Sequence, residues 1–227
     1  MDIRGKITNI KNINNKTRIV VDLEDDYMEL ITRYSSGISA DVELRVDDGR
    51  CLTIQQRGKV FSIIKDIALY TGDAPEYLRG ILTFNYCVET NIPLFSLSDC
   101  SVTIARGFIS FLIDFVLMHN IPMTDLGINR TDDINAYLYS CLKFRRCCIT
   151  GLAGADIHHV TGSRVGMGHD RLKIDHSNLE IIALNREWHN KVHNEGETDV
   201  FEAYKVYGIK GDNVLLDKLG LNYDDIS

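Results

Sequence analysis

The sequence predicts an α+β protein in which a small antiparallel sheet comes first, helices follow, and a second strand-containing module closes the chain. Three observations predict this order. β-Branched residues separated by turn residues fill positions 1–47, apolar residues at helical spacing begin near Thr53, and two short extended segments separated by a glycine-containing loop follow residue 154. A length of 227 residues is enough for one large domain or two small ones.

The first 47 residues contain four segments with the composition of β-strands. Turn-forming residues lie between or after them, including Asn14-Asn15, Asp25-Asp26 and Gly37. We therefore expect a small antiparallel sheet. The four expected strands are Ile3–Ile10, Thr17–Leu23, Met28–Tyr34 and Ile38–Val46.

Helical spacing of apolar residues replaces this pattern after residue 52. In the first expected helix, Val60, Ile63 and Ile67 fall on one face, and Gly72 follows its end. A proline and a glycine interrupt residues 120–131, so we expect a domain boundary there. The expected helices are Thr53–Tyr70, Ala74–Glu89, Ser98–His119, Asp132–Phe144 and, near the end of the chain, Asp199–Tyr207 and Val214–Leu219.

The composition is that of an ordinary globular protein, with 44% hydrophobic and 25% charged residues. No apolar run reaches membrane-spanning length, and the first residues do not resemble a signal peptide, so we expect a cytoplasmic protein without a membrane partner. Six cysteines without a secretion signal do not predict a disulfide framework.

Histidine is concentrated in one stretch. Six of the seven histidines lie between Cys147 and Asn194. Imidazole is the commonest protein metal ligand and the usual general base near neutral pH. The same region is net positive, with eight basic and five acidic side chains over residues 141–193, although the whole chain carries −7. A local positive charge favours a phosphate-bearing substrate.

The spacing of these histidines predicts a metal site. His158 and His159 end a short extended segment, Ala155–Val160, and a second extended segment is expected at Leu179–Leu184. If residues 186–194 form a helix, His189 and His193 lie one turn apart on the same face, where two imidazoles can share one ion.

The expected order of a strand, a loop, a second strand and a helix, together with these histidines, resembles the HNH endonuclease family, also called the ββα-metal fold. The resemblance covers about residues 144–194 and includes the motif Leu184-x-Arg186-x-x-His189-x-x-x-His193. It implies a C-terminal ββα-metal module followed by two short helices. It also implies hydrolysis of DNA phosphodiester bonds with one divalent ion (Mg, Mn, Zn or Ni) that stabilises charge on the phosphate and on the leaving oxygen.

The resemblance also implies roles for individual residues. His159 is the expected general base, and Asn178 is expected to orient it. Asp156 either supports a ligand histidine or a DNA-contacting arginine, or is itself a ligand. The expected metal ligands are His158, His189 and His193, and the expected DNA contacts are Arg164, Arg171, Lys173, Arg186, Arg145 and Arg146.

Less specific interpretations compete for several of these residues. Lys143, Arg145 and Arg146 could form an ordinary solvated helix end, and His169 and His176 are expected to be exposed in a polar loop. Where many HNH relatives carry Cys-x-x-Cys pairs, this chain has Cys148-Ile-Thr-Gly151 and Asn185-Arg-Glu-Trp188. One sulfur cannot hold a tetrahedral zinc, so no second, structural metal is expected.

Residues 50–120 resemble the lambda Orf (NinB) family of phage recombination mediators. The similar features are Gln55-Gln56-Arg57-Gly58-Lys59 at a helix start and the later Ser96-Leu97-Ser98-Asp99. This resemblance implies a homodimer that binds single-stranded DNA and works with single-strand-binding protein. The alternative is that these polar residues are the exposed face of an amphipathic helix.

We therefore expect a DNA-binding or mediator domain at 1–130 and an HNH nuclease domain at 131–227, together a phage-encoded recombination protein in a bacterial host. Its DNA substrate could be single-stranded or branched. One alternative is a non-cleaving mediator with a structural or vestigial HNH module. Another is a site-specific enzyme of a mobile element or packaging system, although no helix-turn-helix is evident.

Overall fold

A computed structural model describes residues 5–23, 25–35, 51–162 and 174–223. The contacts within the chain divide it into two units, Met1–Val46 and Asp47–Ser227. The expected strand Ile38–Val46 lies outside the described residues, as do Arg164, Arg171, Lys173 and His169. The structure confirms the general order of a small antiparallel sheet, then helices, then a second small sheet.

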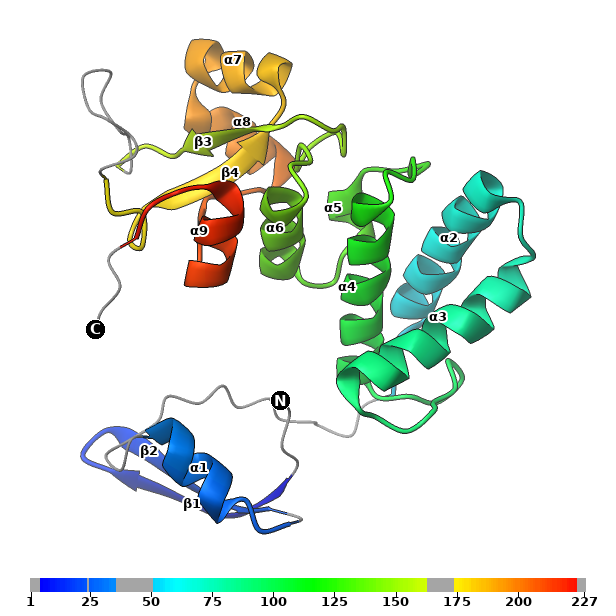
Figure 1. The fold of residues 1–227 in the computed structure, drawn as a ribbon, viewed down its shortest axis with the longest axis vertical. Helices are drawn as coiled ribbons and strands as arrows, with labels where there is room; N and C mark the ends of the chain where they lie inside the picture. The colour runs from blue at the N-terminus through cyan, green and yellow to red at the C-terminus, as the bar shows by residue number, and fades with distance from the viewer. Residues whose placement is uncertain (1–4, 24, 36–50, 163–173, 224–227) are drawn as a thin grey trace. The chain divides into compact units, whose positions relative to one another are not determined.

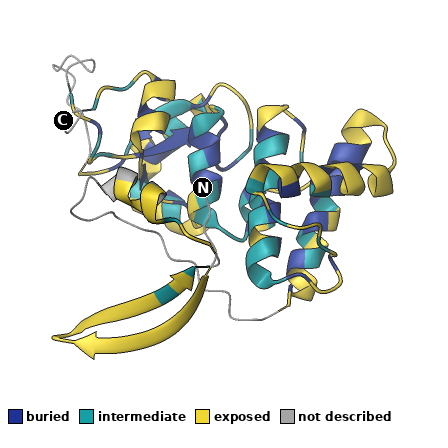
Figure 2. Ribbon diagram, turned by 60° about the horizontal axis from the view of Figure 1, so that its bottom comes forward, coloured by how far each residue is buried: buried dark blue, intermediate teal, exposed yellow. Residues whose placement is uncertain are grey.

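The N-terminal unit contains a β-hairpin. Strands β1 (Gly5–Ile13) and β2 (Lys16–Leu23) pair antiparallel, as expected. Asn14 and Asn15 join them with φ of 53° and 59°, and asparagine is one of the few side-chain-bearing residues that adopt this conformation readily. The hairpin is exposed along nearly its whole length (Figure 2), so its two strands alone do not form a core.

The expected strand Met28–Tyr34 is wrong, because α1 (Met28–Ser35) is a helix. The Asp26 carboxylate accepts a hydrogen bond from the Met28 backbone N–H at 3.0 Å, and the Thr32 hydroxyl donates to the Met28 carbonyl at 2.7 Å. Aspartate favours both turns and helix starts. Here it satisfies a backbone donor at the beginning of the helix.

The helices of the larger unit begin with strong capping signals. Helix α2 (Ile54–Thr71) has a capping box, in which Thr53 and Gln56 satisfy each other's backbone N–H groups. Gly72 ends it in the left-handed conformation that glycine adopts without strain. Helix α3 (Pro75–Thr90) has its proline in the first turn. Both helices match the expected ranges.

Helix α4 (Val102–Met118) starts later than expected. Ser101 is its N-cap and accepts a hydrogen bond from the Ile104 N–H, whereas Ser96 and Ser98 bond each other in the preceding turn. The buried face of α4 packs against α2 and, through Phe108, against Tyr86 of α3. These three helices form the first part of the hydrophobic core.

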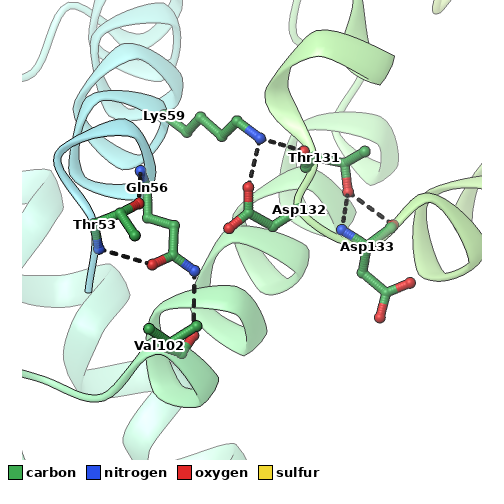
Figure 3. Close-up of polar contacts among 7 residues, drawn as sticks. All are labelled: Thr53, Gln56, Lys59, Val102, Thr131, Asp132 and Asp133. Atoms are coloured by element: carbon green, nitrogen blue, oxygen red, sulfur yellow. Dashed lines mark hydrogen bonds and ion pairs between the residues drawn. The ribbon is translucent and has the colours of Figure 1, made fainter. Parts of the chain in front are cut away.

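Polar contacts join α2 to the segment between α5 (Gly127–Arg130) and α6 (Ile134–Lys143), as Figure 3 shows. The Lys59 ammonium donates to the Thr131 carbonyl and pairs with Asp132. Gln56, which is buried, donates to the Val102 carbonyl of α4 at 3.3 Å. The alternative to the Orf-like resemblance placed Gln56 and Lys59 on an exposed helix face, yet both side chains have partners within the fold.

The C-terminal part is built around a three-stranded sheet in the order β3 (Asp156–His159), β4 (Glu180–Leu184) and β5 (Ile209–Lys210). All neighbouring strands are antiparallel. In Figure 1, α7 (Arg186–Glu195) and α8 (Glu197–Tyr204) lie over one face of this sheet, and α6 and α9 (Asn213–Leu219) lie over the other. Strand β4 is central and its residues Ile181–Leu184 are fully buried.

Hydrogen bonds connect the helical part to this sheet. The Tyr137 hydroxyl of α6 donates to the Cys148 carbonyl at 2.9 Å, and the Cys148 N–H donates to the Ala183 carbonyl of β4. The boundary expected near residue 130 therefore falls inside the larger unit, between α5 and α6. Within the described ranges, no helix is long and apolar enough to cross a membrane.

Substituting Gly127 tests the packing of α5 against α6. A Cβ atom at Gly127 would lie 2.5 Å from the Tyr137 hydroxyl, so we expect Gly127→Ala to lower the free energy of unfolding by about 1–3 kcal/mol. The matched control is Gly58→Ala in α2, where a Cβ meets open space and raises this free energy by about 0.5–1 kcal/mol. Urea unfolding measures both, and a neutral Gly127→Ala would contradict this packing.

Candidate metal centre

Strand β3 and helix α7 bring three histidines together. His158 lies on β3 opposite Ile182 of β4, and it is buried on the side of the sheet that α7 covers. His189 and His193 are one turn apart on α7, whose first turn is capped by the Asn185 side chain. One nitrogen from each of the three rings lies within 4.8 Å of the others.

The arrangement of the three rings suits a metal ion. Their centroids are 4.7–5.1 Å apart, and the rings are steeply inclined to one another rather than stacked. Burial lowers the pKa of His189, the nearby His158 and His193 lower it further, and Asp156 acts in the opposite direction. A lowered pKa favours the neutral imidazole, which is the form that binds metals.

Glu197, at the start of α8, contacts His158, the buried member of the histidine cluster. Its carboxylate lies 3.0 Å from Nε2 of His158 and also accepts the Thr161 backbone N–H. Burial raises the pKa of Glu197, but the hydrogen bonds from His158 and Thr161 outweigh this, and the net pKa lies below its usual value. A carboxylate only accepts, so Nε2 of His158 carries the proton and Nδ1 keeps the lone pair that a metal needs.

Sequence reasoning missed Glu197. The acidic residues directly after the His-x-x-x-His helix were the available signal, with Glu195 and Glu197 flanking Gly196. The sequence does not say which of them turns back toward the strand. In the structure Glu195 pairs with Lys191 on its own helix, whereas Glu197 reaches β3.

Asp156, the first residue of β3, forms an ion pair with Arg186, the first residue of α7. Their side chains are 3.3 Å apart, and the Arg186 side chain is 75% exposed. Asp156 is not one of the three clustered residues, and it contacts Arg186, one of the arginines expected to bind DNA. Arg186 therefore presents its guanidinium to solvent beside His189.

His159 is directed away from the three clustered histidines. Consecutive residues of a strand point to opposite faces, and the ring of His159 contacts that of His176 with centroids 5.3 Å apart. The expectation that His176 is exposed is wrong, because its side chain is fully buried. Asn178, the expected orienting residue, is exposed in the turn before β4.

The side chains of Arg145 and Arg146 both donate hydrogen bonds within the folded chain. Arg146 is buried, and its guanidinium donates to the Leu117 carbonyl at 3.0 Å and to Asn120. Arg145 donates to the Leu219 carbonyl. Cys148 is also fully buried, and burial raises the pKa of its thiol well above the usual value.

Removing one ligand tests the metal centre. His193 is exposed, so His193→Ala leaves the core intact while deleting one donor. In the native protein, we expect metal at about 100 times its Kd to raise the free energy of unfolding by about 2.7 kcal/mol, and we expect the variant to lose this gain. The control is His119→Ala, which replaces the exposed C-cap residue of α4 and should keep the gain. Equal stabilisation of His193→Ala and the native protein would contradict the site.

Neutralising Glu197 tests its support of His158. Glu197→Gln keeps the shape of the side chain but removes the charge that orients the imidazole, so we expect metal affinity to fall about 10- to 100-fold. Isothermal titration calorimetry measures the change. Glu195→Gln is the matched control and should leave the affinity close to that of the native protein. An unchanged affinity in Glu197→Gln would remove Glu197 from the site.

Comparison with known proteins identifies a family for this chain. No curated protein and no solved structure matches the chain. A family model described as "Putative HNHc nuclease" matches residues 19–221. Because the match spans most of the sequence, this chain belongs to that HNH-type nuclease family.

Proposed function

We propose that this protein is a metal-dependent endonuclease that hydrolyses DNA phosphodiester bonds through an HNH site on β3, β4 and α7. The observation that carries the proposal is the convergence of His158, His189 and His193 beside a further histidine, His159, that stays outside the cluster. Three donors leave room for substrate, and a separate imidazole remains for proton transfer. Membership of the nuclease family supports the same activity.

His158, His189 and His193 would hold one divalent ion. When bound, such an ion supplies positive charge that stabilises the phosphate and the leaving oxygen. Glu197 contributes by fixing the ring of His158 and the proton on its Nε2. Burial lowers the pKa of His189, and this favours the neutral imidazole that can bind a metal ion at neutral pH.

His159 is the proposed general base. Its position at the end of β3 puts it next to a ligand histidine in the chain but on the other face of the strand, so it does not compete for the ion. In this role its imidazole takes the proton from the attacking water, a contribution of about 10²- to 10⁴-fold to the rate.

Positive side chains of the histidine-rich part of the chain are proposed to bind the DNA backbone. Arg186 is exposed and is held by Asp156, which makes it the described residue best placed for a phosphate contact. Arg164, Arg171 and Lys173 belong to the same proposal on the basis of sequence. Arg145 is exposed and stays in the proposal, whereas Arg146 is left out because its guanidinium is buried against α4.

The role of residues 1–130 is still a prediction from sequence. We propose that this part selects the DNA, as its similarity to the Orf-like mediators implies, with single-stranded or branched DNA, single-strand-binding protein and a second copy of the chain as partners. Gln56 and Lys59, two residues of that similarity, are engaged in contacts with α4 and with residues 131–132. We therefore propose that DNA contacts by this part come from other side chains.

Cleavage assays with a His159→Ala variant test the nuclease proposal. The substrates are supercoiled plasmid and labelled single-stranded and branched DNA, each with Mg, Mn, Zn, Ni or EDTA. We expect the native protein to cut with metal but not with EDTA, and His159→Ala to bind metal normally while cutting at least about 100-fold more slowly.

His119→Ala is the control for this experiment and should cut like the native protein. If pure, metal-loaded native protein cuts none of these substrates but binds single strands, the alternative of a non-cleaving mediator replaces the nuclease. If His159→Ala cuts at the native rate, the nuclease survives but its base is another residue.

A further inference from the structure

His176 is a fully buried histidine that has no role in the proposed reaction. It lies just before β4, and the Asn222 carbonyl near the end of the described chain accepts both its backbone N–H, at 2.9 Å, and its ring, at 3.0 Å from Nδ1. A carbonyl oxygen only accepts, so Nδ1 carries a proton. The two bonds fix the orientation of the ring and leave Nε2 as the acceptor in the neutral form.

The ring that His176 contacts is that of His159. The two centroids are 5.3 Å apart with the planes inclined by 47°. Nε2 of His176 is buried and has no hydrogen-bond partner among the described residues. Packing alone does not favour such a residue, because a buried nitrogen without a partner is costly and an apolar ring would fill the space without that cost.

We propose that His176 is a positioning residue for His159, in the role that the sequence suggested for Asn178. His176 acts by holding the neighbouring imidazole in place and does not touch substrate. Asn178 is exposed two residues further on, whereas His176 is immobilised by Asn222 and in contact with the proposed base. This inference rests on the proposed function, in which His159 takes the proton from water.

Two substitutions at His176 separate positioning from packing. His176→Phe keeps a ring of similar shape but loses both nitrogens, and His176→Gln keeps a polar group that can lie near the position of Nε2. For plasmid cleavage with saturating Mn, we expect His176→Phe to lower kcat about 10- to 100-fold with little change in KM or in metal affinity. His176→Gln should recover part of the loss.

Two further variants complete the kinetic series. His119→Phe, the same substitution at an exposed histidine, should leave kcat unchanged. Asn178→Ala compares the two candidate orienting residues, and we expect it to lower kcat less than His176→Phe does. A larger loss in Asn178→Ala, or a native kcat in a folded His176→Phe, would overturn the proposal.

Imidazole NMR of the metal-free protein tests the same inference without any cleavage. In long-range ¹H–¹⁵N spectra, with His159 assigned from His159→Ala, we expect His176 to carry its proton on Nδ1. The His159 signals should shift in His176→Phe, while those of His193 stay in place. If His159 is unaffected, the positioning role is wrong even when the native protein cuts DNA. If the shift occurs but the native protein cuts no DNA, only the nuclease proposal fails.

Discussion

The approach of His158 on β3 to His189 and His193 on α7 is the constraint on which the rest of the site depends. A short strand and a short helix have to meet with their imidazoles facing one another, and neither element is long enough to hold this position alone. The pairing of β3 with the buried strand β4 fixes the strand. The Asn185 cap and the burial of Val192 fix the helix, and Glu197 then sets the ring of His158.

The helices before the sheet belong to this support. Helix α6 covers the face of the sheet opposite α7, and Tyr137 ties it to the turn that precedes β3. Arg146 anchors that turn to the C-terminal end of α4, and Lys59 links α2 to the beginning of α6. Charged residues that resemble a DNA-binding set in the sequence thus hold the layers together. A break near residue 130 would separate α4 from a core that it shares with α6.

Much of this could be predicted from the sequence, because the signals are local. The Asn14-Asn15 turn, Gly72 after the first long helix and the four-residue spacing of His189 and His193 each act over a few residues. The segment that forms helix α1 was predicted as a strand, because the aspartates before it are typical of a turn as well as of a helix start. Glu197 and His176 could not be assigned, since their partners lie 39 and 46 residues away and are reached only after the chain folds back. The burial of His176 also depends on tertiary contacts, and the polar residues beside it in the sequence do not indicate it.

The most direct test of the account is a crystal structure of the metal-loaded protein with the ion located by its anomalous scattering. We expect one ion bound by a nitrogen from each of His158, His189 and His193, with Glu197 on the other nitrogen of His158 and with His159 outside the coordination sphere. An ion that binds elsewhere in the chain, or one that is coordinated by His159, would contradict the division of these histidines into ligands and base.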